Sequence, residues 1–300
     1  MMAENFSSLL PHLSAAISAA THRAFTLRDA TPVSGGDINE TWRLDGVDGS
    51  RYFLKLNKEH LLPMFIAEAE GLTALAATRT LRIPQPIAHG SAAGRSFLVL
   101  EYLEFSSRGN ARLLGEQLAA LHRNTAERFG FAHDNFIGAT PQANDWRDDW
   151  ITFWRDQRLG AQLQLAERNG YDLRALGDKL MDKLPEFFDG YAPRPSLLHG
   201  DLWGGNHAYT ADGAPAIFDP AAYYGDREAD IAMTELFGGY SADFYAAYRA
   251  AWPLDSGYAA RKPLYNLYHI LNHANLFGGG YARQAEKMMR ELLTGYAART

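Results

Sequence analysis

His199-Gly200-Asp201-Leu202-Trp203-Gly204-Gly205-Asn206 is the stretch that decides the fold, and Asp219 follows it thirteen residues past the asparagine, at the end of an apolar run. The skeleton is H-x-D-x-x-x-x-N and then a second Asp. Phosphoryl transfer from ATP to an alcohol needs this order: an aspartate that accepts the nucleophile's proton, an asparagine for one Mg²⁺, and an aspartate for the metal bridging the phosphates. Singly, each aspartate is better explained by a structural role, Asp201 by opening a turn and Asp219 by capping a strand end. Their joint spacing favours catalysis.

ATP and Mg²⁺ are the cofactors that this arrangement implies. Mg²⁺ prefers oxygen ligands, keeps several waters and takes one or two carboxylates plus phosphate oxygens. Asn206 and Asp219 are therefore enough to hold it, and Asp201 is the candidate catalytic residue. His199 has an ordinary pKa near neutrality, which suits a general base. In this template, however, the histidine packs behind the catalytic loop, so a structural role is favoured.

A glycine-containing loop in the first third of the chain is a candidate phosphate-binding element. It lies between two expected strands, where glycines let the backbone approach phosphate oxygens closely. Gly35, Gly36 and Asn39 are its candidate nucleotide-binding residues. A simple hairpin turn is the alternative reading of the same glycine pair.

Lys55 and Glu68 form a candidate pair for anchoring the phosphates. Alternation along the expected strand 52–56 places Lys55 on the face opposite Leu54 and Leu56. A lysine in an apolar strand needs a partner or an anionic ligand. On the expected helix 64–78, Glu68 shares the apolar face, whereas Glu70 points away from it. Glu68 is therefore the expected partner, and a solvated glutamate is the alternative.

Three further segments have weaker functional interpretations. Glu101, Tyr102 and Leu103 follow an apolar strand and would supply backbone groups to the adenine edge, or else simply link two lobes. His269 and His273 have the spacing of zinc ligands, but the glutamate of H-E-x-x-H is replaced by isoleucine, which favours a packed or substrate-lining helix. The tryptophans from 146 to 154 could line an acceptor pocket, although aromatic residues at helical spacing are more often core.

The pattern of hydrophobic residues predicts an α+β protein of two lobes with a cleft between them. A helix is expected at 5–21, then strands at 27–33, 41–44, 52–56 and 96–100, with a hairpin at the Asp-Gly pairs 45–46 and 48–49. After Glu101 the chain is mainly helical, with helices expected at 111–124, 145–169, 171–188, 231–237 and 263–276. We expect a small β-rich nucleotide-binding lobe at 1–103 and a larger helical catalytic and substrate-binding lobe at 104–300.

Composition narrows the functional classes. The 300 residues carry a formal net charge of -6, which gives no general attraction to nucleic acid or to an anionic membrane but does not exclude a local basic pocket for a phosphorylated ligand. The absence of cysteine excludes disulfides, thiolate metal sites and cysteine nucleophiles. The N-terminal segment does not read as a secretory signal, and no run has the length of a membrane span. A cytoplasmic location is expected, and the oligomeric state is not indicated.

With these residues established, the chain resembles the fructosamine kinase (ketosamine-3-kinase) family, which is related to aminoglycoside phosphotransferases and choline kinases. The matching stretches are GGDINETW, FLKLN, MFIAEAEGL, FGFAHDNFIG, LLHGDLWGGN, FDPAAYYGDREADIAM and NHANLFGGGY. The resemblance implies a protein-kinase-like fold and phosphorylation of the sugar 3-hydroxyl of ketosamines, including ribulosamine or fructosamine adducts of amines and lysines. Several relatives have a cysteine where this chain has Asp37, so redox control through that thiol cannot operate here.

The same resemblance assigns the residues to roles. It implies that Asp201 accepts the proton, that Asn206 and Asp219 bind the metal, that Lys55 and Glu68 anchor the phosphates, and that residues 101–103 contact adenine. Two alternatives stay open: a kinase for another small alcohol, such as choline or an aminoglycoside, and a non-catalytic nucleotide-binding relative. A metal-dependent hydrolase is disfavoured because a nearby set of His and carboxylate ligands is missing.

Overall fold

The computed structural model describes residues 2–33, 38–106 and 108–297 and divides into two compact units. The first comprises Met1–Gly109 together with Ala208–Asp219, and the second comprises Asn110–His207 and Pro220–Thr300. Residues 208–219 belong to the first unit because they pair with it: Tyr209 lies opposite Ser106, and Ala216 forms a parallel bridge with Arg82. The expected division of functions at residue 103 stays a prediction.

A five-stranded antiparallel sheet organises the first unit, with the strand order β1-β2-β3-β5-β4. Short turns join β2 to β3 and β4 to β5, and the first of them contains Gly49 at a φ of 83°. The elements of this unit are α1 (Met2–Thr21), β1 (Leu27–Pro32), β2 (Glu40–Gly46), β3 (Arg51–Lys58), η1 (Glu59–Leu61), α2 (Leu62–Ala77), β4 (Pro86–Ala92), β5 (Arg95–Glu101), β6 (Phe105–Ser106), β10 (His207–Thr210) and β11 (Pro215–Ile217).

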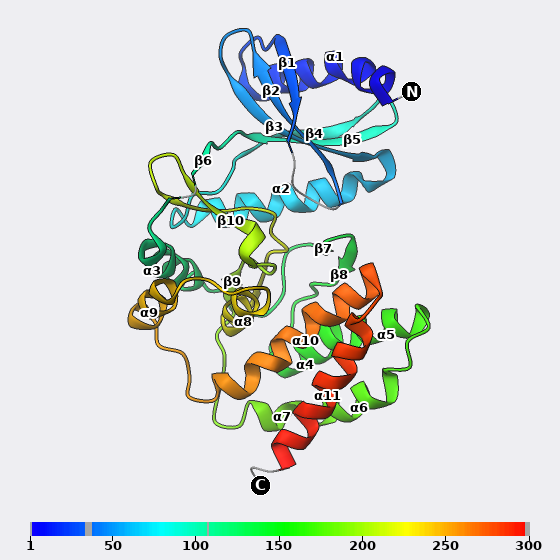
Figure 1. Ribbon diagram of the computed structural model, residues 1–300, viewed down its shortest axis with the longest axis vertical. Helices are drawn as coiled ribbons and strands as arrows, with labels where there is room; N and C mark the ends of the chain where they lie inside the picture. The colour runs from blue at the N-terminus through cyan, green and yellow to red at the C-terminus, as the bar shows by residue number, and fades with distance from the viewer. Residues whose placement is uncertain (1, 34–37, 107, 298–300) are drawn as a thin grey trace. The chain divides into compact units, whose positions relative to one another are not determined.

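Helices cover both faces of this sheet (Figure 1). Leu9, Leu13 and Ile17 recur every four residues along α1 and pack against Leu54 and other apolar side chains of one sheet face. Helix α2 contacts β4 and β5 from the other side and buries Phe65, Leu72 and Leu75. Because side chains alternate along a strand, Leu54 faces α1 while its neighbour in β3, Lys55, faces α2.

The second unit is mainly helical (Figure 1). Helix α10 forms its centre and packs against α5, α8 and α11, while α3 packs against α9. Its elements are α3 (Ala111–His122), β7 (Asn135–Ile137), β8 (Thr140–Gln142), α4 (Trp150–Trp154), η2 (Arg155–Gly160), α5 (Ala161–Arg168), α6 (Arg174–Asp182), α7 (Leu184–Phe187), β9 (Ser196–Leu198), η3 (Gly204–Asn206), β12 (Tyr223–Gly225), α8 (Glu228–Leu236), α9 (Ala242–Ala251), α10 (Tyr258–Phe277) and α11 (Tyr281–Ala297).

Several local differences from the expected elements have physical causes. The helix expected at 145–169 begins only at Trp150, where the Asp149 carboxylate accepts from the Thr152 N–H at 2.7 Å and caps it. The helix expected at 171–188 is two short helices, α6 and α7, because Pro185 in the first turn of α7 has no N–H with which to continue the hydrogen bonds of α6. In the part of the chain that the structure describes, no helix is long and apolar enough to cross a membrane.

Candidate active site

Lys55 lies at the centre of a buried ion-pair group in the first unit. Its Nζ is 2.6 Å from Glu68 Oε1 on α2 and 2.6 Å from Asp219 Oδ1, which follows β11. The expected pairing with Glu68 is therefore present, and Asp219 is a second partner that sequence reasoning did not supply. The side chain of Lys55 is 5% exposed and that of Glu68 14%, whereas that of Asp219 is 43% exposed.

The electrostatics of this group keep Lys55 charged. Burial alone would lower the pKa of Lys55, but the carboxylates of Asp219 and Glu68 outweigh it and raise the pKa above its ordinary value. Burial raises the pKa of Glu68, an effect that Lys55 opposes and Asp219 reinforces. One ammonium thus holds two carboxylates that would otherwise repel each other, and the more exposed of them can reach a cation from solvent.

Asp219 has an unusual backbone conformation, with a φ of 58°. Such left-handed values are uncommon outside glycine, and aspartate tolerates them better than most residues. The residue follows β11, whose Ala216 and Ile217 are buried. The strand fixes the position of Asp219, and the backbone turn aims its carboxylate at Lys55.

The loop around Asp201 lies in the second unit and is folded on itself by short hydrogen bonds. The Asn206 Nδ2 donates to the Asp201 backbone oxygen at 2.8 Å and approaches its carboxylate Oδ2 at 3.4 Å. The Trp203 N–H also donates to the Asp201 oxygen, at 3.1 Å. The spacing of five residues therefore brings together the two side chains that the sequence singled out, with the Asn206 amide nitrogen directed toward Asp201.

Gly200 is needed where the loop begins. Its φ is 82°, and a Cβ atom there would lie 2.1 Å from the carbonyl oxygen of Ala221. Both the conformation and the lack of space exclude a larger residue. The close approach fits the hydrogen bond from the Ala221 N–H to the His199 oxygen at 2.9 Å, which holds the chain after Asp219 against the chain before Asp201.

Asp230 on α8 anchors this loop and was missed by sequence reasoning. Its carboxylate accepts the backbone N–H groups of His199 at 2.7 Å and of Gly200 at 2.9 Å. The Nε2 of His122 lies 3.2 Å from Asp230 Oδ2, the oxygen that also accepts the His199 N–H. Burial would raise the pKa of Asp230, but the hydrogen bond from His122 and those from the backbone lower it overall. An acid in the apolar run from Asp230 to Met233 was the available signal.

His199 is fully buried, and its Nδ1 accepts the Asp201 N–H at 3.3 Å. It therefore supports the backbone beside Asp201, as expected for a structural histidine. Burial lowers the pKa of His122, so its ring is neutral near pH 7. Its Nε2 then donates to Asp230, and its Nδ1, which is 2.7 Å from the Tyr248 hydroxyl, accepts from it.

The remaining nucleotide-binding candidates lie in the first unit, except that Gly35, Gly36 and Asp37 lie outside the described residues. Asn39 Oδ1 accepts from Asn57 Nδ2 at 2.7 Å, which ties the end of that loop to β3. The Glu101 carboxylate pairs with Arg82, and the Glu101 N–H donates to the Gln85 oxygen at 2.8 Å. The Tyr102 ring lies 5.2 Å from the Arg51 guanidinium, and Leu103 follows it, half-buried.

The tryptophans and the two histidines that the sequence singled out are packed in the second unit. Trp150 and Trp154 are 2% and 1% exposed, so they form core rather than an acceptor pocket. Burial, reinforced by His273, lowers the pKa of His269 to about 3. The Nδ1 of His273 is hydrogen-bonded to the His269 oxygen at 2.8 Å, and its ring packs on Phe237. Both histidines are packed within α10 and its surroundings.

The chemistry of the expected metal ligands fits Mg²⁺. Across residues 2–33, 38–106 and 108–297, no three His, Asp or Glu side chains are grouped to hold a metal ion by themselves. Mg²⁺ needs only one or two protein oxygens beside phosphate oxygens and water. The half-exposed Asp219 carboxylate and the Asn206 amide are donors of that kind.

Comparison with known proteins identifies the group to which the sequence belongs. The family model described as fructosamine kinase matches residues 9–295. The chain belongs to the fructosamine kinase family. It is 50% identical to a probable ketoamine kinase of Synechocystis sp., with 92% of this chain and 94% of that protein aligned. It is 43% identical to the chloroplastic protein-ribulosamine 3-kinase of Arabidopsis thaliana, over 87% of this chain and 81% of that protein.

Solved structures agree with the family and with the expected fold. A fructosamine-3-kinase homologue from Haemophilus somnus 129PT superposes with a TM-score of 0.86 at 30% identity, covering 94% of this chain and 96% of that one. Choline kinase LicA from Streptococcus pneumoniae gives a TM-score of 0.61 at 14% identity over 95% and 99% of the two chains, a likeness of fold alone. The predicted α+β, protein-kinase-like fold is confirmed.

Proposed function

We propose that this member of the fructosamine kinase family phosphorylates the sugar 3-hydroxyl of ketosamines with ATP. Family membership supports ATP as the phosphoryl donor. Relatives named as ketoamine and ribulosamine 3-kinases support a ketosamine acceptor. The observation that carries the proposal in this chain is the Asp201 loop, in which an aspartate and an asparagine five residues apart are joined by a hydrogen bond and anchored by Asp230.

Asp201 is proposed as the catalytic residue. Its carboxylate orients the 3-hydroxyl of the sugar in line with the γ-phosphate and takes its proton as the new oxygen–phosphorus bond forms and ADP leaves. Phosphoryl transfer depends mainly on positioning and charge neutralisation, so this carboxylate does not need a raised pKa. The fixed backbone on both sides of Asp201 serves that positioning.

The nucleotide is proposed to bind through residues of the first unit. Lys55, oriented by Glu68, pairs with the α- and β-phosphates, while Gly35, Gly36 and Asn39 present the phosphate-binding loop. The backbone of Glu101, Tyr102 and Leu103 pairs with the adenine edge. Asn206 and Asp219 would hold Mg²⁺, which supplies neutralisation of the phosphate charge when bound.

Trp203 is proposed to form part of the acceptor site. It lies two residues after Asp201, is 40% exposed, and its ring packs edge-on against Phe237 at 6.4 Å. The Tyr240 hydroxyl donates to the Trp203 oxygen at 3.2 Å and fixes the backbone there. An exposed aromatic ring beside the proton acceptor provides an apolar surface for the sugar and its amine substituent.

An assay of ADP release across several acceptors tests the proposal. Ribulosamine and fructosamine adducts of lysine, choline and an aminoglycoside are each offered with ATP and Mg²⁺. We expect turnover with the ketosamines, in a protein that we place in the cytoplasm. If only choline or an aminoglycoside is turned over, the proposed substrate is wrong, and the protein is a kinase for another small alcohol. No ADP release with any acceptor, despite nucleotide binding, would favour a non-catalytic relative.

A further inference from the structure

The second unit contains a cavity of about 510 Å³ whose lining includes neither Asp201 nor Asn206. It is formed where the end of α3, the segment before β9, the start of α8 and the end of α9 meet. Its volume lies in the range of sites that bind small molecules. The lining residues are Arg123, Thr125, Tyr191, Ala192, Pro193, Arg194, Ser196, Asp226, Arg227 and Trp252.

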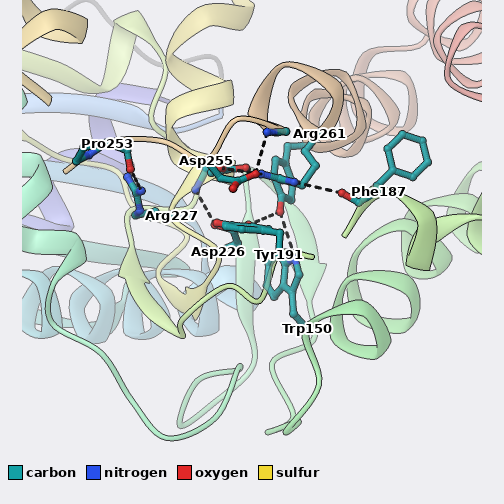
Figure 2. A network of polar contacts seen from close by, with 11 residues as sticks. Trp150, Phe187, Tyr191, Asp226, Arg227, Pro253, Asp255 and Arg261 are labelled. Atoms are coloured by element: carbon teal, nitrogen blue, oxygen red, sulfur yellow. Dashed lines mark hydrogen bonds and ion pairs between the residues drawn. The ribbon is translucent and has the colours of Figure 1, made fainter. Parts of the chain in front are cut away.

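Three arginines converge on this cavity without carboxylate partners. Arg227 is buried and donates to the Tyr248 hydroxyl and to the backbone oxygens of Trp252 and Pro253, as Figure 2 shows for Pro253. Arg123 donates to the backbone oxygen of Ala251. Within the described residues, neither of them nor Arg194 forms an ion pair. These hydrogen bonds of Arg227 and Arg123 therefore go to neutral acceptors, and Arg194 adds a third positive charge to the lining.

The one acidic residue in the lining does not cancel these charges. Asp226 is 1% exposed, and its two oxygens accept from the hydroxyls of Tyr191 and Tyr265 and from the Glu228 N–H, as Figure 2 shows for Tyr191. All of these donors are neutral. Burial raises the pKa of Asp226. The carboxylate is satisfied where it stands, and the lining keeps a surplus of positive charge.

Two other features of the lining point to an anionic ligand. The guanidinium carbons of Arg227 and Arg123 lie 4.1 and 5.5 Å from the centre of the Trp252 ring, so two cations share one aromatic side chain. Two cations held at one aromatic side chain leave a local positive charge that an anion in the cavity would stabilise. Ser196 is fully buried in the lining, and its hydroxyl has no hydrogen-bond partner. Such a hydroxyl gains from a ligand that accepts its hydrogen.

We propose that this cavity binds a phosphate monoester of about the size of a phosphorylated sugar, at a site separate from the catalytic one. Guanidinium groups match phosphate oxygens in pairs, and a dianion with three free oxygens can engage more than one arginine. The cavity exceeds what inorganic phosphate alone fills, and Thr125 offers a hydroxyl group to the remainder of such a ligand.

Hydrogen bonds connect this cavity to the catalytic loop. Arg227 donates to the Tyr248 hydroxyl, which lies 2.7 Å from His122, and His122 reaches Asp230. Asp230 in turn holds the N–H of Gly200. Because every step is a direct bond between buried groups, a phosphate ester that draws on Arg227 shifts the chain that fixes the loop. We expect occupancy to change the turnover number.

Calorimetric titration of the full chain tests the site. Saturating Mg²⁺ and a non-hydrolysable ATP analogue fill the nucleotide site, and fructose 6-phosphate, fructose, inorganic phosphate and citrate are titrated separately. We expect one site for fructose 6-phosphate, weaker binding of inorganic phosphate and none of fructose. Arg194→Ala should weaken binding about tenfold, and the double variant Arg123→Ala/Arg194→Ala more, since each removes charge-assisted hydrogen bonds. Both residues are exposed, so folding is not at stake.

Arg168→Ala is the matched control, because Arg168 is an exposed arginine at the end of α5, outside the cavity. Its affinity should equal that of the wild type. No binding of either phosphate compound at millimolar concentration, equal affinity in the double variant, or preference for citrate would each overturn the proposal. A turnover number that fructose 6-phosphate leaves unchanged, with ketosamine and ATP saturating, would refute the connection to the loop. None of the binding measurements depends on the proposed catalytic function.

Discussion

Lys55 holds its charge in a place where burial works against it. The compensation comes from two carboxylates at 2.6 Å, one contributed by a neighbouring helix and one by a residue 164 positions later in the sequence. Helical periodicity could predict the first partner, because Glu68 shares a face with buried apolar residues. It could not predict the second, because the pairing depends on how residues 208–219 join the first unit.

Asp201→Asn tests the role of the proposed proton acceptor. We expect turnover to fall by at least about a hundredfold, the effect of losing a general base and orienting group, while ATP affinity stays close to that of the wild type. Steady-state kinetics and equilibrium nucleotide binding measure the two quantities. Near wild-type turnover in a variant with an unchanged circular dichroism spectrum would remove Asp201 from the mechanism.

Asp219→Ala tests the proposed metal ligand. We expect nucleotide binding to lose its dependence on Mg²⁺, because the only carboxylate among the proposed ligands is removed. His273→Ala, and likewise His269→Ala, should leave the metal requirement unchanged, since both rings are packed in α10. Titration of nucleotide with and without Mg²⁺ measures this. One equivalent of zinc in the wild type, lost on changing either histidine, contradicts the assignment.

At the scale of elements, the helices and strands with strong hydrophobic periodicity could be predicted from the sequence, and those with weak periodicity could not. The helix expected at 5–21 corresponds to α1, and the strands expected at 52–56 and 96–100 lie within β3 and β5. Strand β4 was missed because it begins with Pro86 and contains Gly90, residues that disfavour strands. It tolerates a proline because it is an edge strand.

The catalytic loop shows the same limit within the site. Its own residues were readable because H-x-D-x-x-x-x-N is a short, local pattern. Its support was not, because Asp230 and His122 come from α8 and α3 and meet the loop only after the second unit folds. A buried acid inside an apolar helix indicates that a hydrogen-bond donor lies near it in the fold, but it does not indicate which residue supplies that donor.

Helix α1 is an integral part of the first unit. The substitution Leu13→Ala measures how much its packing contributes to stability. Leu13 is 1% exposed and packs in the core beside the sheet, whereas Leu10 on the same helix is half-buried at its edge. We expect Leu13→Ala to lower the free energy of unfolding by about 2–5 kcal/mol and Leu10→Ala by clearly less. Urea denaturation compares the two leucine truncations. Equal losses would mean that α1 does not fill the core as described.

At the scale of the whole molecule, the proposed reaction draws on both units. Lys55, Glu68 and Asp219 belong to the first, and Asp201 and Asn206 to the second. Each group is held by contacts within its own unit, so each is preorganised before substrate arrives. The net charge of -6 makes the arginine-lined cavity a local exception in an acidic protein, which suits binding of small anions rather than nucleic acid.

Selectivity for the acceptor is a property of the whole molecule, and the catalytic residues alone do not determine it. A quaternary ammonium needs several aromatic rings around it, whereas a ketosamine needs hydrogen bonds to several hydroxyls and room for a secondary amine. Trp150 and Trp154 are buried in the core, whereas Trp203, Phe237 and Tyr240 are aromatic residues near the Asp201 loop. Trp203 and Phe237 pack edge-on against each other, which suits a wall for a sugar better than an enclosing cage.

We therefore expect ribulosamine adducts of lysine to be phosphorylated and choline to be ignored. Mass spectrometry of the product should show one added phosphoryl group on the 3-oxygen of the sugar, with ADP released in equal amount. Trp203→Ala should raise the KM for the ketosamine while leaving that for ATP unchanged, because the ring is proposed to contact only the acceptor. A higher specificity constant for choline, with no ketosamine modified, would contradict the proposed substrate. The protein would still be a kinase, because the Asp201 loop can act on any alcohol that reaches it.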